Sequence, residues 1–164
     1  MGLMLESMAI EMPPVEGHPN RVGFRGVLTV VDAASDKAPA GARGHRVLLT
    51  RRAAEAAIPS LMGMGLDYSP ALDRHDARRK IGVITRADIV GRIIEVGGFL
   101  YARDFPEVVA EIGGTRLGMS YEIADALVED IKASVWVLNR VTFTGAAVLR
   151  RDKAAYFSTW IELG

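Results

Sequence analysis

The run Ser134–Leu149, SVWVLNRVTFTGAAVL, consists almost entirely of residues that favour β-strands. Branched and aromatic side chains fit the pleated surface of a sheet, so this run predicts one long strand. Shorter stretches of the same kind lie before and after it. They predict further strands at Val22–Val31, Arg46–Thr50, two within Ile81–Ala102 joined near Ala87-Asp88, Leu117–Ile123 and Phe157–Leu163.

Two segments between these strands have helical patterns. Arg51–Met62 has apolar residues spaced as on one face of a helix. A second helix is expected to begin near Asp104, as N-cap before Pro106 and Glu107, and to end at Gly113-Gly114. The charged stretch Leu66–Lys80 is expected to be a loop. About seven short strands with two or three helices predict an α+β fold, a barrel or sandwich with helices outside it.

Length and composition limit the class of protein. The chain of 164 residues has the size of one domain, which we place at residues 21–164 after a flexible N-terminal arm at residues 1–20. Twenty basic and twenty acidic residues give a net charge of zero, which argues against a nucleic-acid binder. Met1–Pro14 lacks the pattern of a signal peptide or a spanning helix, and no membrane association is expected.

The residues available for catalysis are few. Since the chain has no cysteine, a nucleophile would be a hydroxyl, lysine or carboxylate group, and one of three histidines is the simplest base. His18 lies in the N-terminal arm and His45 at the start of a strand, whereas His75 lies in a loop between Asp73 and Asp76. An adjacent carboxylate can orient an imidazole, although a surface histidine is an equally good reading of His75.

Ser120 is the unusual serine. It lies within the apolar strand LGMSYE, where a hydroxyl must find a partner, face a cavity or face solvent. The flanking residues do not form the Gly-x-Ser-x-Gly turn of α/β-hydrolases, which disfavours a hydrolase of small esters. Phosphate-binding loops and paired histidines with zinc-ligand spacing are absent from the sequence.

The order of these features resembles a known family. His75-Asp76 precedes Lys80-Ile81-Gly82, a β region ends at Gly97–Ala102, and a helix is followed by Leu117–Ser120 and then Val141–Ala147. This order resembles the prohead (head maturation) serine proteases of tailed bacteriophages, which are related to the herpesvirus assemblins. The resemblance covers roughly residues 21 to 150.

The resemblance implies a herpesvirus-protease-like fold, a mainly antiparallel β-barrel of about seven strands with surrounding helices. It implies that Ser120 is the nucleophile and His75 the base, with no cofactor. The third catalytic group of the family comes from a later strand, where this chain has neither an acid nor a histidine in Asn139–Thr144. Thr142 is the candidate there, with Asp76, Asp73 and Asp125 as alternatives. Gly145 and Ala146 are the oxyanion-hole candidates.

The function implied is that of a phage capsid-maturation serine endopeptidase. It would cleave scaffold and capsid proteins, and itself, inside the prohead in the host cytoplasm, acting as a homodimer. The arm at residues 1–20 would be a propeptide. The alternative is a catalytically inactive capsid assembly or scaffold protein on the same fold, suggested by the missing third residue.

Overall fold

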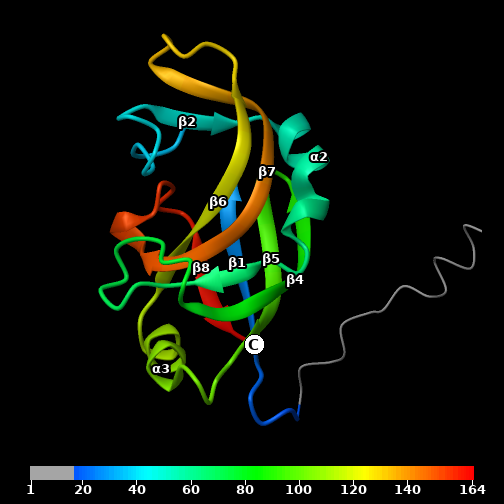
Figure 1. The fold of residues 1–164 in the computed structure, drawn as a ribbon, viewed down its shortest axis with the longest axis vertical. Helices are drawn as coiled ribbons and strands as arrows, with labels where there is room; N and C mark the ends of the chain where they lie inside the picture. The colour runs from blue at the N-terminus through cyan, green and yellow to red at the C-terminus, as the bar shows by residue number, and fades with distance from the viewer. Residues whose placement is uncertain (1–16) are drawn as a thin grey trace, which may run out of the picture.

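The structure, a computed structural model, describes residues 17–164 and is shown in Figure 1. In chain order its elements are β1 (Val22–Val30), β2 (Arg46–Leu49), α2 (Arg51–Leu61), β3 (Gly65–Asp67), β4 (Lys80–Val90), β5 (Ile93–Leu100), α3 (Pro106–Gly114), β6 (Leu117–Val128), β7 (Val135–Arg150), a 3₁₀ turn at Arg151–Lys153 and β8 (Trp160–Leu163).

The strands close into a barrel. Their order is β7-β3-β4-β5-β1-β8-β6, and β6 pairs again with β7, so seven strands form a ring. The short β2 lies outside this ring and runs parallel to the start of β7. β3 also runs parallel to β7, whereas the other neighbouring strands are antiparallel. The prediction of a mainly antiparallel barrel of about seven strands is confirmed.

Three local predictions are corrected by the structure. The hairpin between β4 and β5 turns at Gly91-Arg92 rather than near Ala87-Asp88, because Gly91, with φ 59, supplies the left-handed first position of a two-residue turn. Gly65–Asp67, at the start of the expected loop, is the strand β3. The N-cap of α3 is Phe105, which makes no side-chain capping bond, instead of Asp104.

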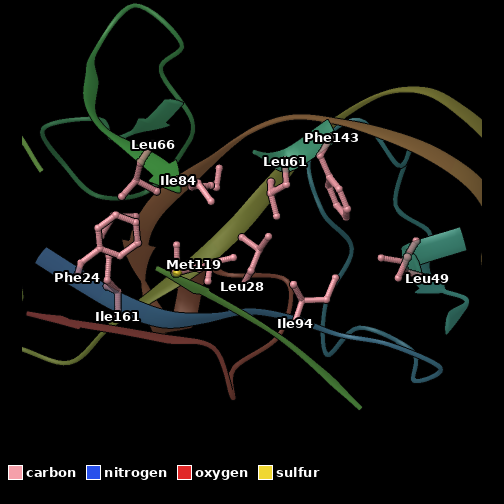
Figure 2. Packing of buried hydrophobic residues seen from close by; sticks show 14 of the residues in the cluster. Phe24, Leu28, Leu49, Leu61, Leu66, Ile84, Ile94, Met119, Phe143 and Ile161 are labelled. Atoms are coloured by element: carbon pink, nitrogen blue, oxygen red, sulfur yellow. The ribbon is translucent and has the colours of Figure 1, made fainter. Parts of the chain in front are cut away.

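The interior of the barrel is apolar. Inward-facing side chains alternate along the strands, as they do in small barrels whose interior is filled by side chains. Figure 2 shows them converging from strands that are distant in the sequence; they include Phe24, Leu28, Ile84, Ile94, Met119, Phe143 and Ile161, all buried.

The two helices cover the barrel from outside. α2 lies beside β7 and buries Ala53, Ala54, Ala57 and Leu61, while α3 lies at the lower end in Figure 1. Neither helix in residues 17–164 has the length and apolar character required to cross a bilayer.

The expected N-terminal arm falls largely on residues 1–16, which lie outside the described part of the chain. The described residues before β1 contact the loop between β5 and α3. Asn20 accepts a hydrogen bond from the Arg103 amide at 2.8 Å and donates one to Asp104 at 2.9 Å. The segment that leads into β1 is therefore fixed to the loop before α3.

Replacement of Gly98 by alanine should strongly destabilise the barrel. Gly98 lies in β5, and a Cβ atom there would be 1.9 Å from the carbonyl oxygen of Val83 in β4. Since backbone cannot move aside locally, we expect a loss of about 3 kcal/mol in unfolding free energy, near the upper end of overpacking effects. Urea unfolding measures this loss. Gly114→Ala is the matched control, because a Cβ atom there meets nothing within 4 Å. Equal stability of both variants would contradict the close approach.

Candidate active site

Ser120 and Glu122 lie on the same face of β6. They are two residues apart in a strand, and side chains at that spacing point to the same side of a sheet. Ser120 is paired with Ala147 of β7 and Glu122 with Gly145. The hydroxyl and the carboxylate therefore project together from one side of the β6–β7 ladder.

Asp67 extends this row to a third strand. β3 lies on the other side of β7, and Asp67 is paired with Ala147, the residue that also faces Ser120. Paired residues in neighbouring strands share a face of the sheet. Ser120, Ala147 and Asp67 thus form a row across β6, β7 and β3, and Ala147 between the two polar residues is small.

Gly145 leaves space for the carboxylate of Glu122. A Cβ atom at Gly145 would be 3.2 Å from Glu122 Oε2 and 3.0 Å from the carbonyl oxygen of Gly65. The Glu122 side chain consequently lies across β7, above Gly145, in the direction of β3. A larger residue at position 145 would push it away.

The loop between β3 and β4 brings His75 to this face. Three contacts hold the loop: the Asp76 amide donates to Asp67 Oδ1 at 3.0 Å, Ser69 donates to Asp73 at 2.9 Å, and the Arg150 amide donates to the carbonyl oxygen of Leu72 at 2.7 Å. These contacts hold the loop against β3 and β7, and the imidazole of His75 consequently lies over the sheet.

His75 and Glu122 form the central contact. His75 Nδ1 lies 2.9 Å from Glu122 Oε1, and the two side chains are 27% and 20% exposed. Such a contact is satisfied when Nδ1 carries the hydrogen and donates it to the carboxylate. In the neutral ring with this tautomer, the other nitrogen, Nε2, has a free lone pair and is able to accept a proton.

The two carboxyl groups have opposite pKa shifts. Burial, followed by the hydrogen bond with Glu122, raises the pKa of Asp67 to about 7, against the lowering effects of the Asp76 amide and Lys80. Burial raises the pKa of Glu122 as well, but hydrogen bonds from Asp67 and His75 outweigh it and lower that pKa overall. The first proton to leave the pair is therefore that of Glu122, and Asp67 keeps its proton to a higher pH than Glu122 does.

A cleft of about 650 Å³ opens beside these residues. His75, Ser120 and Glu122 all line it, together with the segment Lys37–Ala42 and apolar side chains of β6 and β7. The described residues contain no hydrogen bond between Ser120 and His75. Catalytic hydrogen bonds are often long before substrate binds, and both groups face the same open space.

Among solved structures, the chain is similar to the capsid assembly protease gp21 of bacteriophage T4, with a TM-score of 0.52 and 13% sequence identity. The similarity covers 79% of this chain and 98% of that chain. The chain has the fold of a phage prohead protease. No family model matches the sequence, and no curated protein sequence matches it. At this level of identity the similarity establishes the prohead-protease fold alone, and the chemistry is argued from the residues of this chain.

Thr142 lies away from His75 in this prohead-protease fold. It is exposed on β7 and paired with Ala124, whereas Ala147 of the same strand faces Ser120. Along a strand the five steps from residue 142 to residue 147 span about 16 Å. The group that contacts His75 is Glu122 instead.

The other acidic candidates for orienting His75 are held in different contacts. Asp76 accepts hydrogen bonds from Arg78 and Arg79, and Asp73 is bonded to Ser69. Asp125 is exposed and has a φ of 53 at an irregularity of β6, beyond Glu122. Asp73 lines the cleft, and Asp76 fixes the loop through its amide.

Gly145 and Ala146, the oxyanion candidates, lie in the middle of β7. Ala146 is paired on one side with Tyr121 and on the other with Leu66, so its backbone groups lie within the sheet. Gly145 is the residue beneath the Glu122 carboxylate. Arg151, in the 3₁₀ turn that follows β7, donates a hydrogen bond to the carbonyl oxygen of Phe157 at 2.7 Å.

Sequence reasoning missed Glu122 and Asp67. A signal for Glu122 was present, because a carboxylate two residues after a strand serine must share its face. Asp67 lies in a strand of three residues that is too short to display alternation. Only the pairing of β3 with β7 reveals its position.

The cluster has the spacing of a cation site. Asp67, His75 and Glu122 each place one ligand atom within 4.8 Å of the others. His75 and Glu122 are already joined by a hydrogen bond, and the Lys80 ammonium lies 3.8 Å from Asp67 Oδ2. Because the His75–Glu122 contact is already made and a cation already faces Asp67, we assign no metal ligands here.

Proposed function

We propose that this protein is a serine endopeptidase in which Ser120 is the nucleophile, His75 the general base and Glu122 the residue that orients His75. The observation that carries the proposal is the 2.9 Å contact between His75 Nδ1 and Glu122 on the same face and in the same cleft as Ser120. A hydroxyl on its own is a weak nucleophile, and a base oriented by a third group activates it.

The proposed reaction follows the general scheme of acyl transfer. Ser120 Oγ attacks the peptide carbonyl carbon while His75 Nε2 accepts its proton, and Glu122 stabilises the imidazolium through Nδ1–H. The C–N bond then breaks as His75 returns the proton to the leaving amine. Water, activated by His75, cleaves the resulting ester of Ser120.

Glu122 also bears on the choice between an active and an inactive protein. The reason for considering an inactive assembly or scaffold protein was the lack of an acid or histidine in Asn139–Thr144. A glutamate that contacts His75 from the strand of Ser120 supplies the missing group.

The similar solved structure supports a proposal for the substrates. The similar protein is the capsid assembly protease of a phage, so we propose scaffold and capsid proteins as substrates and the inside of the prohead, in the host cytoplasm, as the place of action. The homodimer and the self-cleavage stay predictions from the resemblance, and the propeptide role of residues 1–20 stays a prediction from the composition of that arm.

A fluorophosphonate probe tests the proposed chemistry without any knowledge of the substrate. Ser120 Oγ would form a bond to phosphorus as fluoride leaves, with His75 accepting the hydroxyl proton. We expect one adduct per chain by intact mass, located on Ser120 by peptide mass spectrometry. His75→Ala should slow labelling by about 10²-fold or more.

Ser158→Ala is the matched control, because Ser158 is an exposed serine outside the cleft. It should label as fast as the wild type. Labelling that persists in Ser120→Ala, or that occurs equally at several serines, would refute the assignment of the nucleophile.

A further inference from the structure

Asp67 is a buried acid that the proposed reaction does not use. Its side chain is fully buried, yet it lies beside another carboxylate, Glu122, with ligand oxygens within 4.8 Å. Two ionised carboxylates in one buried site repel each other strongly, and one of them normally retains its proton. This carboxyl pair bears on the proposed reaction because Glu122 is also the residue that contacts His75.

The two oxygens of the Asp67 carboxyl group have different hydrogen-bond surroundings. Oδ1 accepts a hydrogen bond from the Asp76 amide at 3.0 Å, whereas Oδ2 is buried without a hydrogen-bond donor among the described residues. The nearest cation to Oδ2 is Lys80 Nζ at 3.8 Å, outside hydrogen-bond distance. A proton on Asp67 removes the unpaired charge and turns this carboxyl into a donor.

We propose, building on the proposed function, that Asp67 is a positioning residue whose buried carboxyl group keeps its proton where an exposed aspartate has lost it and donates it to Glu122, which holds Glu122 against His75. With its other oxygen Asp67 binds the Asp76 amide. One side chain thereby fixes both the acid on β6 and the loop that carries His75.

The surrounding charges agree with this proposal. The titratable groups that face Asp67 are Glu122 from β6, His75 from the loop at 3.9 Å and Lys80 from β4 at 3.8 Å. Burial and Glu122 favour the protonated form, and their effect exceeds that of Lys80 and the Asp76 amide. Asp67 therefore loses its proton about three pH units higher in the folded protein than in the unfolded chain, near pH 7 instead of near pH 4.

The stability test does not depend on activity. Because the folded pKa is raised, the folded state holds a proton that the unfolded state has released, and stability is lost as pH rises from about 4 to about 7. Asp67→Asn keeps a donor and an acceptor but cannot titrate. Between pH 4 and 8 the unfolding temperature of the wild type should fall by roughly 5–10 °C relative to that of Asp67→Asn.

Asp88→Asn is the matched control for the stability test. Asp88 is an exposed acid in β4, and its unfolding profile should stay parallel to that of the wild type. Parallel profiles for Asp67→Asn and the wild type would show that Asp67 titrates as an ordinary acid, and would overturn the proposal. A larger increase in unfolding temperature on addition of Zn²⁺ to the wild type than to Asp67→Asn would also overturn it, because the pair would then be a cation site.

The rate of Ser120 labelling tests the positioning role. Above pH 7, ionised Asp67 repels Glu122, so the wild-type rate should fall by roughly 3- to 10-fold relative to Asp67→Asn. Asp67→Ala removes both hydrogen bonds and should be slower at every pH, with Asn restoring the rate. Equal losses in Asn and Ala would contradict the role of a neutral donor.

The proposed hydrolysis and the proposed proton on Asp67 can be refuted separately. A wild type that shows the expected divergence in unfolding but reacts with no probe would refute the proposed hydrolysis and leave the proton on Asp67 established. A wild type that labels at Ser120, with parallel unfolding profiles, would refute the proton alone.

Discussion

Ser120→Ala should abolish cleavage of the cognate capsid or scaffold protein, lowering kcat/KM by a factor on the order of 10⁴ or more. The variant removes the nucleophile and leaves His75 and Glu122 in contact. Because Ser120 Oγ takes part in no hydrogen bond among the described residues, we expect the unfolding temperature to change little. Intact mass and gel analysis of the substrate after incubation measure the loss.

His75→Ala, made in parallel, should cause a loss of similar size, since a nucleophile and its base act as a unit and their effects do not add. Ser158→Ala should process the substrate at the wild-type rate. Full processing by folded Ser120→Ala would refute the serine mechanism. A wild type that cleaves nothing, even when assembled with its capsid partners, would favour the inactive assembly protein.

The second large effect is expected from Glu122→Gln, which should lower kcat by about 10²- to 10⁴-fold with little change in KM. The amide retains the size of the side chain, and the loss comes from two physical changes. Glutamine cannot stabilise the imidazolium that forms during attack, and its NH₂ group can bind the unprotonated Nδ1, which places the hydrogen on the nitrogen that should face Ser120.

Glu95→Gln is the matched control for this variant. Glu95 is an exposed glutamate in the middle of β5, and its replacement should change kcat by less than about twofold. Thr142→Val tests the alternative third residue in the same assay, and we expect it to be near wild type. A normal kcat for Glu122→Gln, combined with a large loss in Thr142→Val, would transfer the orienting role to Thr142.

The local pattern of the sequence predicts most of the fold because strands and helices leave periodic signals. The β-rich runs around Val22, Leu117 and Val135 became strands, and the helix after Thr50 begins where its side chain caps the Ala53 amide at 3.1 Å. Prediction failed where the signal is short or depends on a partner. β3 has three residues, and the β4–β5 turn at Gly91 depends on the register of two strands.

The residues of the site were also predictable only in part. Ser120 and His75 stand out in the sequence because a hydroxyl in an apolar strand and a histidine between aspartates are locally unusual. Local patterns indicate no further member of the site correctly, since the third group they predict, Thr142, lies in another strand about twenty residues after Ser120. Glu122 is close to Ser120 in the sequence, but its contact with His75 depends on the direction in which the loop of His75 folds.

The sequence by itself determined the kinds of element, their order and two of the side chains that line the proposed site, since each depends on a short stretch of residues. The tertiary structure alone decided which acid contacts His75 and that Asp67 lies buried beside it. Both facts follow from the register in which β3 and β6 pair with opposite edges of β7, bringing positions 67, 147 and 120 into one row. Such register is set by the packing of the whole barrel, so no local pattern reports it.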